Sequence, residues 1–199
     1  TPHGARLVRA PRTAGVARLD LHARTWRWLR GDGCGPGTPI ALAVAREIVA
    51  CAARGKQGTV RATSSDGTPR WEWTGDSVDG VLAAGDVVAV VDGDRLHVLD
   101  AVDGHVLGEL ISDDGGPPRA AVLDVGGMTM VVAAERGRVV GRLAHVQLTP
   151  AWALEVAGVV RDILPSADGA LVVLEDGDAY RIAARTGVAT ALPGLGLVW

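Results

Sequence analysis

Several residue types are missing or scarce in this chain. It contains no asparagine and no phenylalanine, one tyrosine, and a single lysine, Lys56, beside nineteen arginines. Because aromatic residues make up only 4% of the chain, Val, Leu, Ile and Ala must fill its core. The depletion of residues with AT-rich codons indicates a GC-rich bacterial genome, so the arginine count says little about nucleic acid. Acidic and basic residues interleave and the formal net charge is −3, so we expect no nucleic-acid partner.

Cysteine is also scarce. Cys34 and Cys51 are the only two, too few for a disulfide framework or a four-ligand structural zinc site. Cys51 lies in the apolar run 48–52, which favours a small buried thiol over a disulfide. Cys34 lies in a glycine-rich turn. A reduced pair would suit a reducing compartment.

Long apolar runs are absent as well. None reaches the roughly 18 residues that a membrane-spanning helix needs, and no signal-peptide pattern follows Thr1. We therefore expect a soluble protein without a membrane span. Localisation stays open: the cytoplasm is favoured, and the periplasm would require a signal sequence before Thr1.

A unit of strands and turns recurs along the chain. Its clearest copy runs from Val81 to Ile111, where the apolar run 86–91 is followed by a turn, the alternating segment 95–100, a turn ending at Gly104, and a returning strand. Such patterns are typical of buried and half-buried strands. Similar copies cover 39–73, 118–156 and 159–192, and an incomplete copy lies at the N-terminus.

The spacing of the copies indicates the fold. Turn glycines Gly67 and Gly104 lie 37 residues apart, and Gly104 and Gly187 lie 83 apart. Periods near 40 residues with four strands are typical of β-propeller blades, whereas a β-sandwich would have only about seven strands. The sequence predicts an all-β protein, a β-propeller of about five four-stranded antiparallel blades over residues 1–199. The expected blades are 5–30 plus 194–199, 38–74, 79–112, 118–157 and 158–193.

Two details of this fold stay open. The apolar segment Leu195–Trp199 could pair beside Arg6–Arg9 and close a small ring, because open blade edges leave backbone groups unpaired. Alternatively, the chain is part of a larger propeller. The segment Val44–Ala53 is apolar enough for a short helix, although its β-branched residues favour a strand.

Two segments, 96–104 (Leu-His-Val-Leu-Asp-Ala-Val-Asp-Gly) and 66–71 (Asp-Gly-Thr-Pro-Arg-Trp), resemble the blade repeat of the pyrroloquinoline-quinone-type β-propeller family. Quinoprotein dehydrogenases, outer-membrane assembly lipoproteins and many non-catalytic, WD40-like propellers share this pattern. The resemblance implies that Trp71 packs between neighbouring blades as a docking tryptophan. Gly108 and Ala191 occupy the corresponding places in two other copies.

Enzymatic function is not expected. A quinoprotein dehydrogenase of this family would need a calcium site that includes Asn, a catalytic Asp and about eight blades, whereas this chain has no Asn and about five blades. No G-x-S-x-G nucleophile elbow is present. We therefore expect no catalytic residue, no cofactor and no metal.

The remaining candidates for metal ligands have structural interpretations. His22, His97 and His145 take similar places in three different blades, which spreads them around the ring and argues against shared ligation. The acidic segments 92–94, 112–115 and 175–178 lack the spacing of calcium loops, and we expect hairpin turns there.

Tryptophan pairs give the one candidate contact surface. Trp26 and Trp28, like Trp71 and Trp73, are two residues apart on a strand and therefore share a face. Trp26, Trp28 and Trp73 could bind a partner, or they could pack between blades. The function hypothesis is a non-catalytic scaffold that binds a protein partner or another domain of its parent polypeptide. The alternatives are a quinoprotein dehydrogenase fragment, a ligand-binding propeller, or an envelope assembly factor.

The missing asparagine generates a first prediction. Calorimetric titration of the purified protein with pyrroloquinoline quinone and with calcium should show no tight binding of either. A saturable isotherm in the micromolar range would overturn the non-enzyme hypothesis.

Overall fold

The computed structural model describes residues 5–9, 16–20, 25–28, 38–45, 48–64 and 66–192, with side chains from residue 41 onward apart from Leu42. Every regular element in these ranges is a β-strand, and the strands form five antiparallel sheets in sequence order. We call these sheets blades 1 to 5. Across the same ranges we find no helix of the length and apolar character that a bilayer crossing requires.

The blades follow the chain one after another. Blade 1 has three strands: β1 (Ala5–Arg9), β2 (Val16–Asp20) and β3 (Thr25–Trp28). Blade 2 has β4 (Thr38–Ala45), β5 (Ile48–Arg54), β6 (Gly58–Ser64) and β7 (Pro69–Gly75). Blade 3 has β8 (Val78–Ala84), β9 (Val87–Asp92), β10 (Arg95–Asp100) and β11 (Val106–Ile111).

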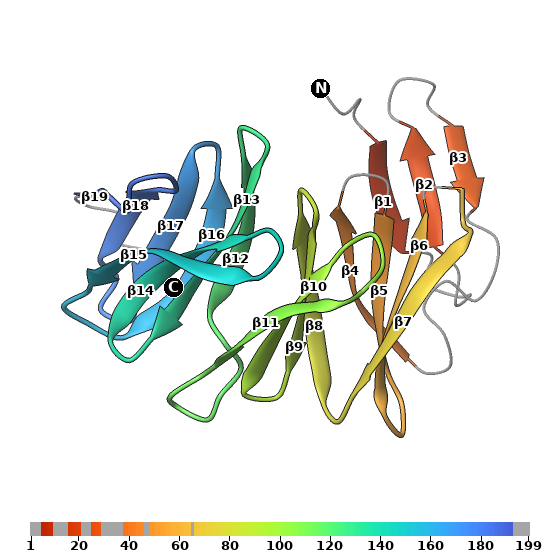
Figure 1. The fold of residues 1–199 in the computed structure, drawn as a ribbon, viewed down its shortest axis with the longest axis horizontal. Coiled ribbons are helices and arrows are strands. Elements are labelled where there is room, and N and C mark those ends of the chain that lie inside the picture. Colours follow the sequence, from red (N-terminus) through yellow and green to blue (C-terminus); the bar gives the residue numbers. More distant parts are fainter. Residues whose placement is uncertain are drawn as a thin grey trace.

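The last two blades repeat this order. Blade 4 has β12 (Ala120–Val125), β13 (Met128–Glu135), β14 (Arg138–Ala144) and β15 (Leu148–Glu155). Blade 5 has β16 (Val160–Ser166), β17 (Gly169–Leu174), β18 (Ala179–Ala183) and β19 (Ala189–Ala191). The first strands β4, β8, β12 and β16 make the contacts from one blade to the next, and the sheets lie face to face in an arc (Figure 1).

Apolar cores fill the three successive junctions that run from blade 2 to blade 5. The core between blades 2 and 3 contains Val60 and Val90, the next contains Val98 and Val131, and the third contains Val132 and Val172, all buried. Small branched side chains suit this arrangement because sheets pack at about 10 Å and both faces of an inner blade are covered. The chain is therefore an all-β propeller, as the repeat predicted.

The outer part of the junction between blades 2 and 3 is closed by a tryptophan. The indole of Trp71 on β7 lies over Gly104 in the β10–β11 turn, and its Nε1 donates a hydrogen bond to the carbonyl of Ala101 at 2.9 Å. Gly104 has a φ of +77°, and a Cβ there would lie 2.7 Å from the indole. Both the turn conformation and the contact therefore require glycine.

The junction between blades 4 and 5 uses the same arrangement. Trp152 on β15 lies over Gly187 in the β18–β19 turn, and its Nε1 donates to the carbonyl of Ala184 at 2.6 Å. The resemblance implied docking for Trp71 alone, so Trp152 is a second docking residue that the sequence did not reveal.

At the junction between blades 3 and 4, a glycine stands where the other two junctions have a docking tryptophan. Gly108 on β11 pairs with Val98, as Trp71 pairs with Ala62 in blade 2, so Gly108 stands at the docking place. A Cβ on Gly108 would lie 2.7 Å from Cβ of Leu148 on β15. The larger side chain therefore comes from the following blade.

The structure settles several expectations about the strands. Four of the expected five blades have four strands, and Ile48–Arg54 is a strand rather than a short helix. Pairing of 194–199 with blade 1 lies outside the described residues.

Cys51 differs from expectation. It is buried, but it is disulfide-bonded, so the favoured interpretation of a free thiol was wrong. An apolar run buries a disulfide as readily as a thiol, so the pattern did not separate the two. Cys34 lies outside the described residues.

The docking geometry generates a second prediction. Trp71→Ala should lower the free energy of unfolding by about 3 to 5 kcal/mol, because it removes a large aromatic group from a packed junction. Glu72 points to the opposite face and forms an exposed ion pair with Arg61, so Glu72→Ala should cost about 1 kcal/mol or less. Urea unfolding of both variants measures the difference, and equal losses would contradict the assigned strand register.

Candidate functional site

Two adjoining hollows lie at one end of the propeller, where the β11–β12 connector meets the β13–β14 hairpin. The inner hollow, of about 180 Å³, is bounded by residues 112–114, Arg119, the hairpin 134–138 and residues 158–160. The outer hollow, of about 750 Å³, lies between residues 109–111 of β11 and the β14–β15 face of blade 4. Both include Asp113, Glu135, Arg136 and Arg138.

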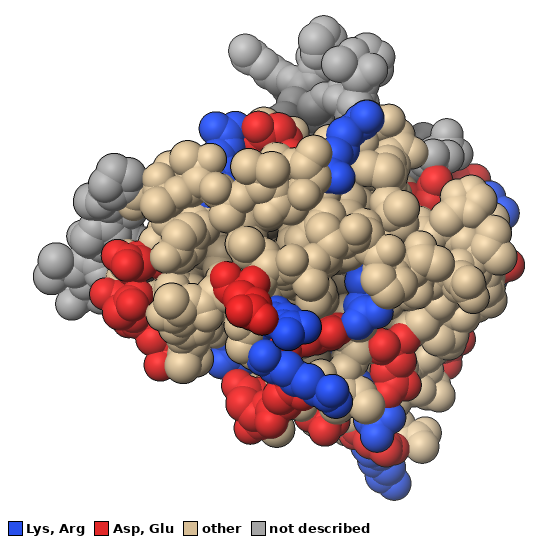
Figure 2. Space-filling view, turned by 60° about the vertical axis from the view of Figure 1, so that its left-hand side comes forward, with Lys and Arg blue, Asp and Glu red and all other residues tan. Residues whose placement is uncertain are grey.

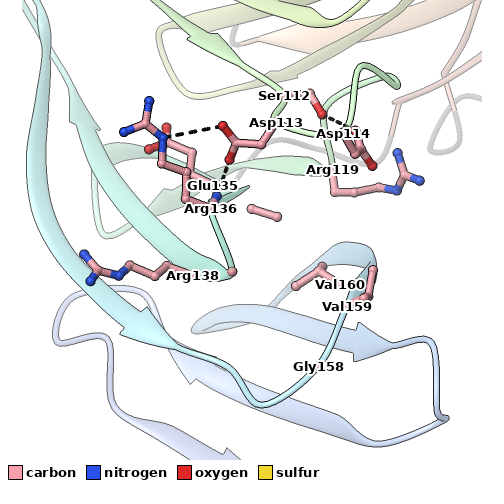
Figure 3. Close-up of a pocket in the computed structure, with 12 residues that line it drawn as sticks. Ser112, Asp113, Asp114, Arg119, Glu135, Arg136, Arg138, Gly158, Val159 and Val160 are labelled. Carbon is pink, nitrogen blue, oxygen red and sulfur yellow. Dashed lines mark hydrogen bonds and ion pairs between the residues drawn. The ribbon is translucent and has the colours of Figure 1, made fainter.

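Turn interactions set the geometry of the inner hollow (Figure 3). The hydroxyl of Ser112 donates to Oδ1 of Asp114 at 2.5 Å, and the same oxygen accepts the amide of Gly116 at 3.0 Å. Oδ2 of Asp113 accepts a hydrogen bond from the backbone amide of Arg136. Oδ1 of Asp113 lies 3.5 Å from the guanidinium Nε of the same arginine. The connector is thus held against the hairpin of blade 4.

Arg119 links this connector to the next blade. Its guanidinium donates to the carbonyl of Pro117 at 2.6 Å and to the carbonyl of Arg161 on β16 at 3.1 Å. Both bonds use backbone acceptors, and the positive charge of Arg119 also helps to lower the pKa of Asp114.

The outer hollow is lined by both apolar and charged residues. The apolar ones are Leu110, Ile111, Val140 and Ala153, of which Leu110 is buried and Ile111 is exposed. At the rim, Arg142 Nη2 donates to both oxygens of Glu135, at 2.8 and 3.0 Å. Arg142 Nε is buried and has no hydrogen-bond partner.

Opposite charges balance around the two hollows. The acidic lining residues are Glu109, Asp113, Asp114 and Glu135, and the basic ones are Arg119, Arg136, Arg138 and Arg142. Figure 2 shows acidic and basic side chains interleaved over the lower part of the face in view, below a largely uncharged area. This lining contains no His or Cys, and its one hydroxyl, on Ser112, faces a carboxylate rather than a base. Such a lining offers ion pairs and hydrogen bonds to a bound group.

The Ser-x-Asp turns lower carboxyl pKa values. The Ser112 hydroxyl, followed by the Gly116 amide, lowers the pKa of Asp114, because both stabilise the ionised form. The same pattern, with the Ser64 hydroxyl as the largest cause and the amide of Thr68 next, lowers the pKa of Asp66 to about 2.

Of the three tryptophans predicted to contact a partner, the structure describes the side chain of one. Trp73 is half-buried on β7, and its ring centroid lies 4.9 Å from that of His97 in blade 3. The strand β3 carries Trp26 and Trp28, whose side chains lie outside the described residues. Partner binding by these three residues stays a prediction, and Trp73 is not among the residues that line the hollows.

The acidic segments form turns, as expected. Gly93, Gly115 and Gly177 have positive φ values of +60°, +69° and +92°, which glycine adopts without strain.

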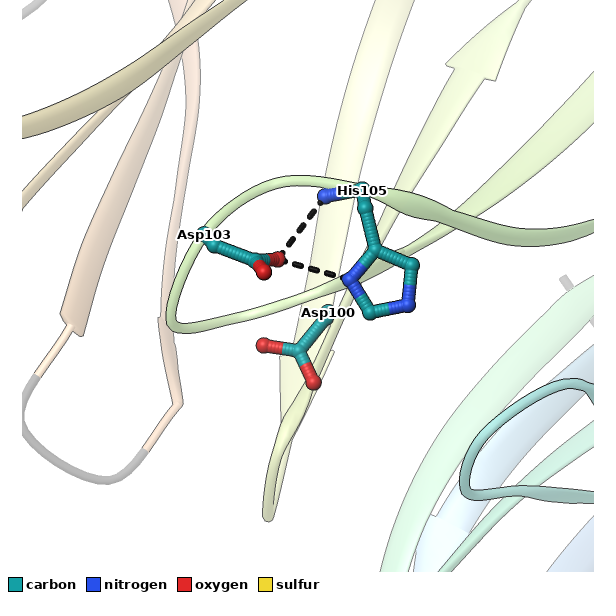
Figure 4. Close-up of side chains that lie close together, drawn as sticks. All are labelled: Asp100, Asp103 and His105. Atoms are coloured by element: carbon teal, nitrogen blue, oxygen red, sulfur yellow. Dashed lines mark hydrogen bonds and ion pairs between the residues drawn. The ribbon is translucent and has the colours of Figure 1, made fainter.

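One mixed group lies in the β10–β11 turn (Figure 4). Asp100, Asp103 and His105 each place one possible ligand atom within 4.8 Å of the others. Asp100 accepts the amide of Val102 at 2.7 Å, and Asp103 accepts the amide of His105 at 3.0 Å and lies 2.7 Å from its Nδ1. These bonds shape the turn on which Trp71 docks, so the turn itself accounts for the group.

Sequence reasoning missed the hollows. The segment Glu135-Arg-Gly-Arg138 is visible as a charged hairpin, but the outer hollow depends on which residue of β11 faces blade 4. The repeat already placed Gly108 at the docking position of Trp71, but no local pattern revealed that Leu148 of blade 4 packs there.

Comparison with known proteins supports the fold. No family model matches the chain, and no curated protein does. Among solved structures, BamB from Moraxella catarrhalis is 12% identical with a TM-score of 0.55, covering 94% of this chain and 78% of that one. The computationally designed Ika4 protein is 18% identical with a TM-score of 0.52, covering 76% of this chain and 92% of that one. At these identities the likeness concerns the fold alone.

The lowered pKa of Asp114 generates a third prediction. The Ser112 hydroxyl and the Gly116 amide stabilise the ionised carboxylate of Asp114. Their contribution to folding stability should be fully present above the ordinary carboxyl pKa near 3.8, and it should be lost as the pH falls through the lower pKa of folded Asp114. Ser112→Ala should raise the pKa of Asp114 in a carbon-13 NMR titration, because it removes the largest cause. Ser77→Ala, in the β7–β8 linker, is the control and should leave it unchanged. An unchanged pKa in Ser112→Ala would refute this assignment.

Proposed function

We propose that this chain is a non-catalytic β-propeller scaffold that binds a protein partner, or another domain of its parent polypeptide, through the connector end of blades 3 to 5. The observation that carries the proposal is the balanced charged lining of the two hollows. Four acidic and four basic side chains line the hollows together with apolar residues such as Leu110 and Val140. Protein interfaces commonly combine an apolar centre with a charged rim, which gives specificity through charge complementarity.

The proposal excludes a polyanion as partner. A nucleic acid would need an excess of basic residues, whereas the lining is balanced and the whole chain carries −3. A quinoprotein dehydrogenase fragment or a ligand-binding propeller remains the alternative for the same fold, and the calorimetric titration above decides it.

A second candidate function is an envelope assembly factor. The disulfide-bonded Cys51 favours it, because disulfides persist mainly in oxidising compartments such as the periplasm. Under this proposal the partner would be an envelope protein, bound at the same connector end.

Site-specific photo-crosslinking in cells of the source organism tests the proposal. A photoreactive amino acid at Ile111 or Val159, both exposed near the hollows, should give a discrete protein adduct. The same group at Val146, exposed in the β14–β15 turn, should give none. Adducts from Val146 alone, or from no position, would overturn binding through the connector end.

A further inference from the structure

Each junction between blades has an outer position two residues beyond the docking place. Trp73 on β7 takes it in blade 2 and packs on His97, and Leu154 takes it in blade 4, where it shares a core with Tyr180. In blade 3 the residue is Leu110, which shares a core with Val140 of blade 4. The pair Leu110 and Val140, the third of these contacts, contains no aromatic ring.

The outer hollow lies at this third pair. Leu110 and Val140 both line it, together with Ile111, which is 52% exposed. The corresponding space between blades 2 and 3 is taken up by the indole of Trp73. The hollow therefore has the position and surroundings that an aromatic side chain occupies one junction away.

An open strand edge borders the hollow. β11 is the end strand of its sheet. The amide of Ser112 donates inward to the carbonyl of Asp94 at 2.8 Å. Because backbone groups alternate along an antiparallel strand, those of Glu109 and Ile111 point outward. An extended peptide can pair with such an edge.

The arginines at the rim of the outer hollow differ in how strongly they are paired. The guanidinium of Arg142 is held by both oxygens of Glu135, and its Nε is buried, so Arg138 is the more accessible arginine at this rim. Arg138 pairs with Glu155 at 3.1 Å, and their side chains are 55% and 80% exposed, so this ion pair is weak. A carboxylate on the ligand would replace Glu155 as the partner of Arg138.

We propose that the outer hollow docks an extended segment of a partner protein, which pairs along β11 and inserts an aromatic side chain flanked by carboxylates. The inference rests on the proposed scaffold function and names the chemistry of the segment bound. It differs from the predicted contact surface of Trp26, Trp28 and Trp73, because it uses a different junction.

Two matched peptides test this docking. The probe is acetyl-Ser-Glu-Trp-Glu-Ser-amide, and its control replaces Trp with Ala. Methyl NMR of the whole chain should show the probe shifting the signals of Leu110, Ile111 and Val140. The control should bind at least about tenfold more weakly, because burial of an indole is worth more than 1.4 kcal/mol.

Two variants locate the site. Val140→Tyr places in blade 4 the ring that Tyr180 provides in blade 5, and it should fill the hollow and abolish probe binding. Its matched control, Val188→Tyr, puts the same ring at an exposed turn and should bind normally. Arg138→Glu should weaken the probe and bind acetyl-Ser-Lys-Trp-Lys-Ser-amide in its place, a gain that a merely unstable variant would not show.

The outcomes separate the two proposals. Saturable methyl shifts confined to the hollow, lost in Val140→Tyr, support the inference whatever the crosslinking shows. Should Val140→Tyr fail to fold, the wild-type shifts and the Arg138→Glu exchange decide. Absence of shifts, or equal binding of the Trp and Ala peptides, would overturn the docking inference, and crosslinks at the connector end would then still support the scaffold function.

Discussion

Close contact between a tryptophan ring and a left-handed glycine in the next blade is the constraint on which the outer part of this propeller depends. An end strand has no further strand to pair with, so side chains must fix the angle between adjacent blades. Trp71 and Trp152 do so with the indole face on Gly104 or Gly187 and one hydrogen bond to a turn carbonyl. The turn must bring that carbonyl and that glycine together, which explains the shared spacing of Ala101 to Gly104 and Ala184 to Gly187.

Polar contacts between linker and hairpin fix two of the junctions, the one between blades 2 and 3 and the one between blades 3 and 4. Between blades 2 and 3, the carboxylate of Asp92 accepts the linker amides of Asp76 and Ser77, at 3.2 and 2.5 Å. Between blades 3 and 4 the direction is reversed, because Asp113 of the linker accepts the hairpin amide of Arg136. A carboxylate thus joins linker and hairpin in both cases, and the charged hollows result from how this requirement is met at the second junction.

The sequence predicted the strands well because each depends on local patterns: apolar runs for strands such as Val87–Asp92, and glycines with positive φ for the turns. It predicted Trp71 as a docking residue because Gly67, four residues before it, marks the repeat. The turn before Trp152, residues 145–147, contains no glycine. No glycine therefore marks the position of Trp152 as Gly67 marks that of Trp71. The disulfide of Cys51 and the hollows depend on contacts between distant segments, which local patterns do not encode.

The contact of Gly108 with Leu148 shows how a repeat protein can leave a hollow between two blades without losing its fold. Leu148 fills the inner part of the space that an indole takes elsewhere, so the blades keep their approach and the cores around Val98 and Val131 stay buried. The space beyond, at the level of Leu110 and Val140, needs no side chain for the blades to pack. The charged residues of the β13–β14 hairpin line this space, outside the apolar core that holds blades 3 and 4 together.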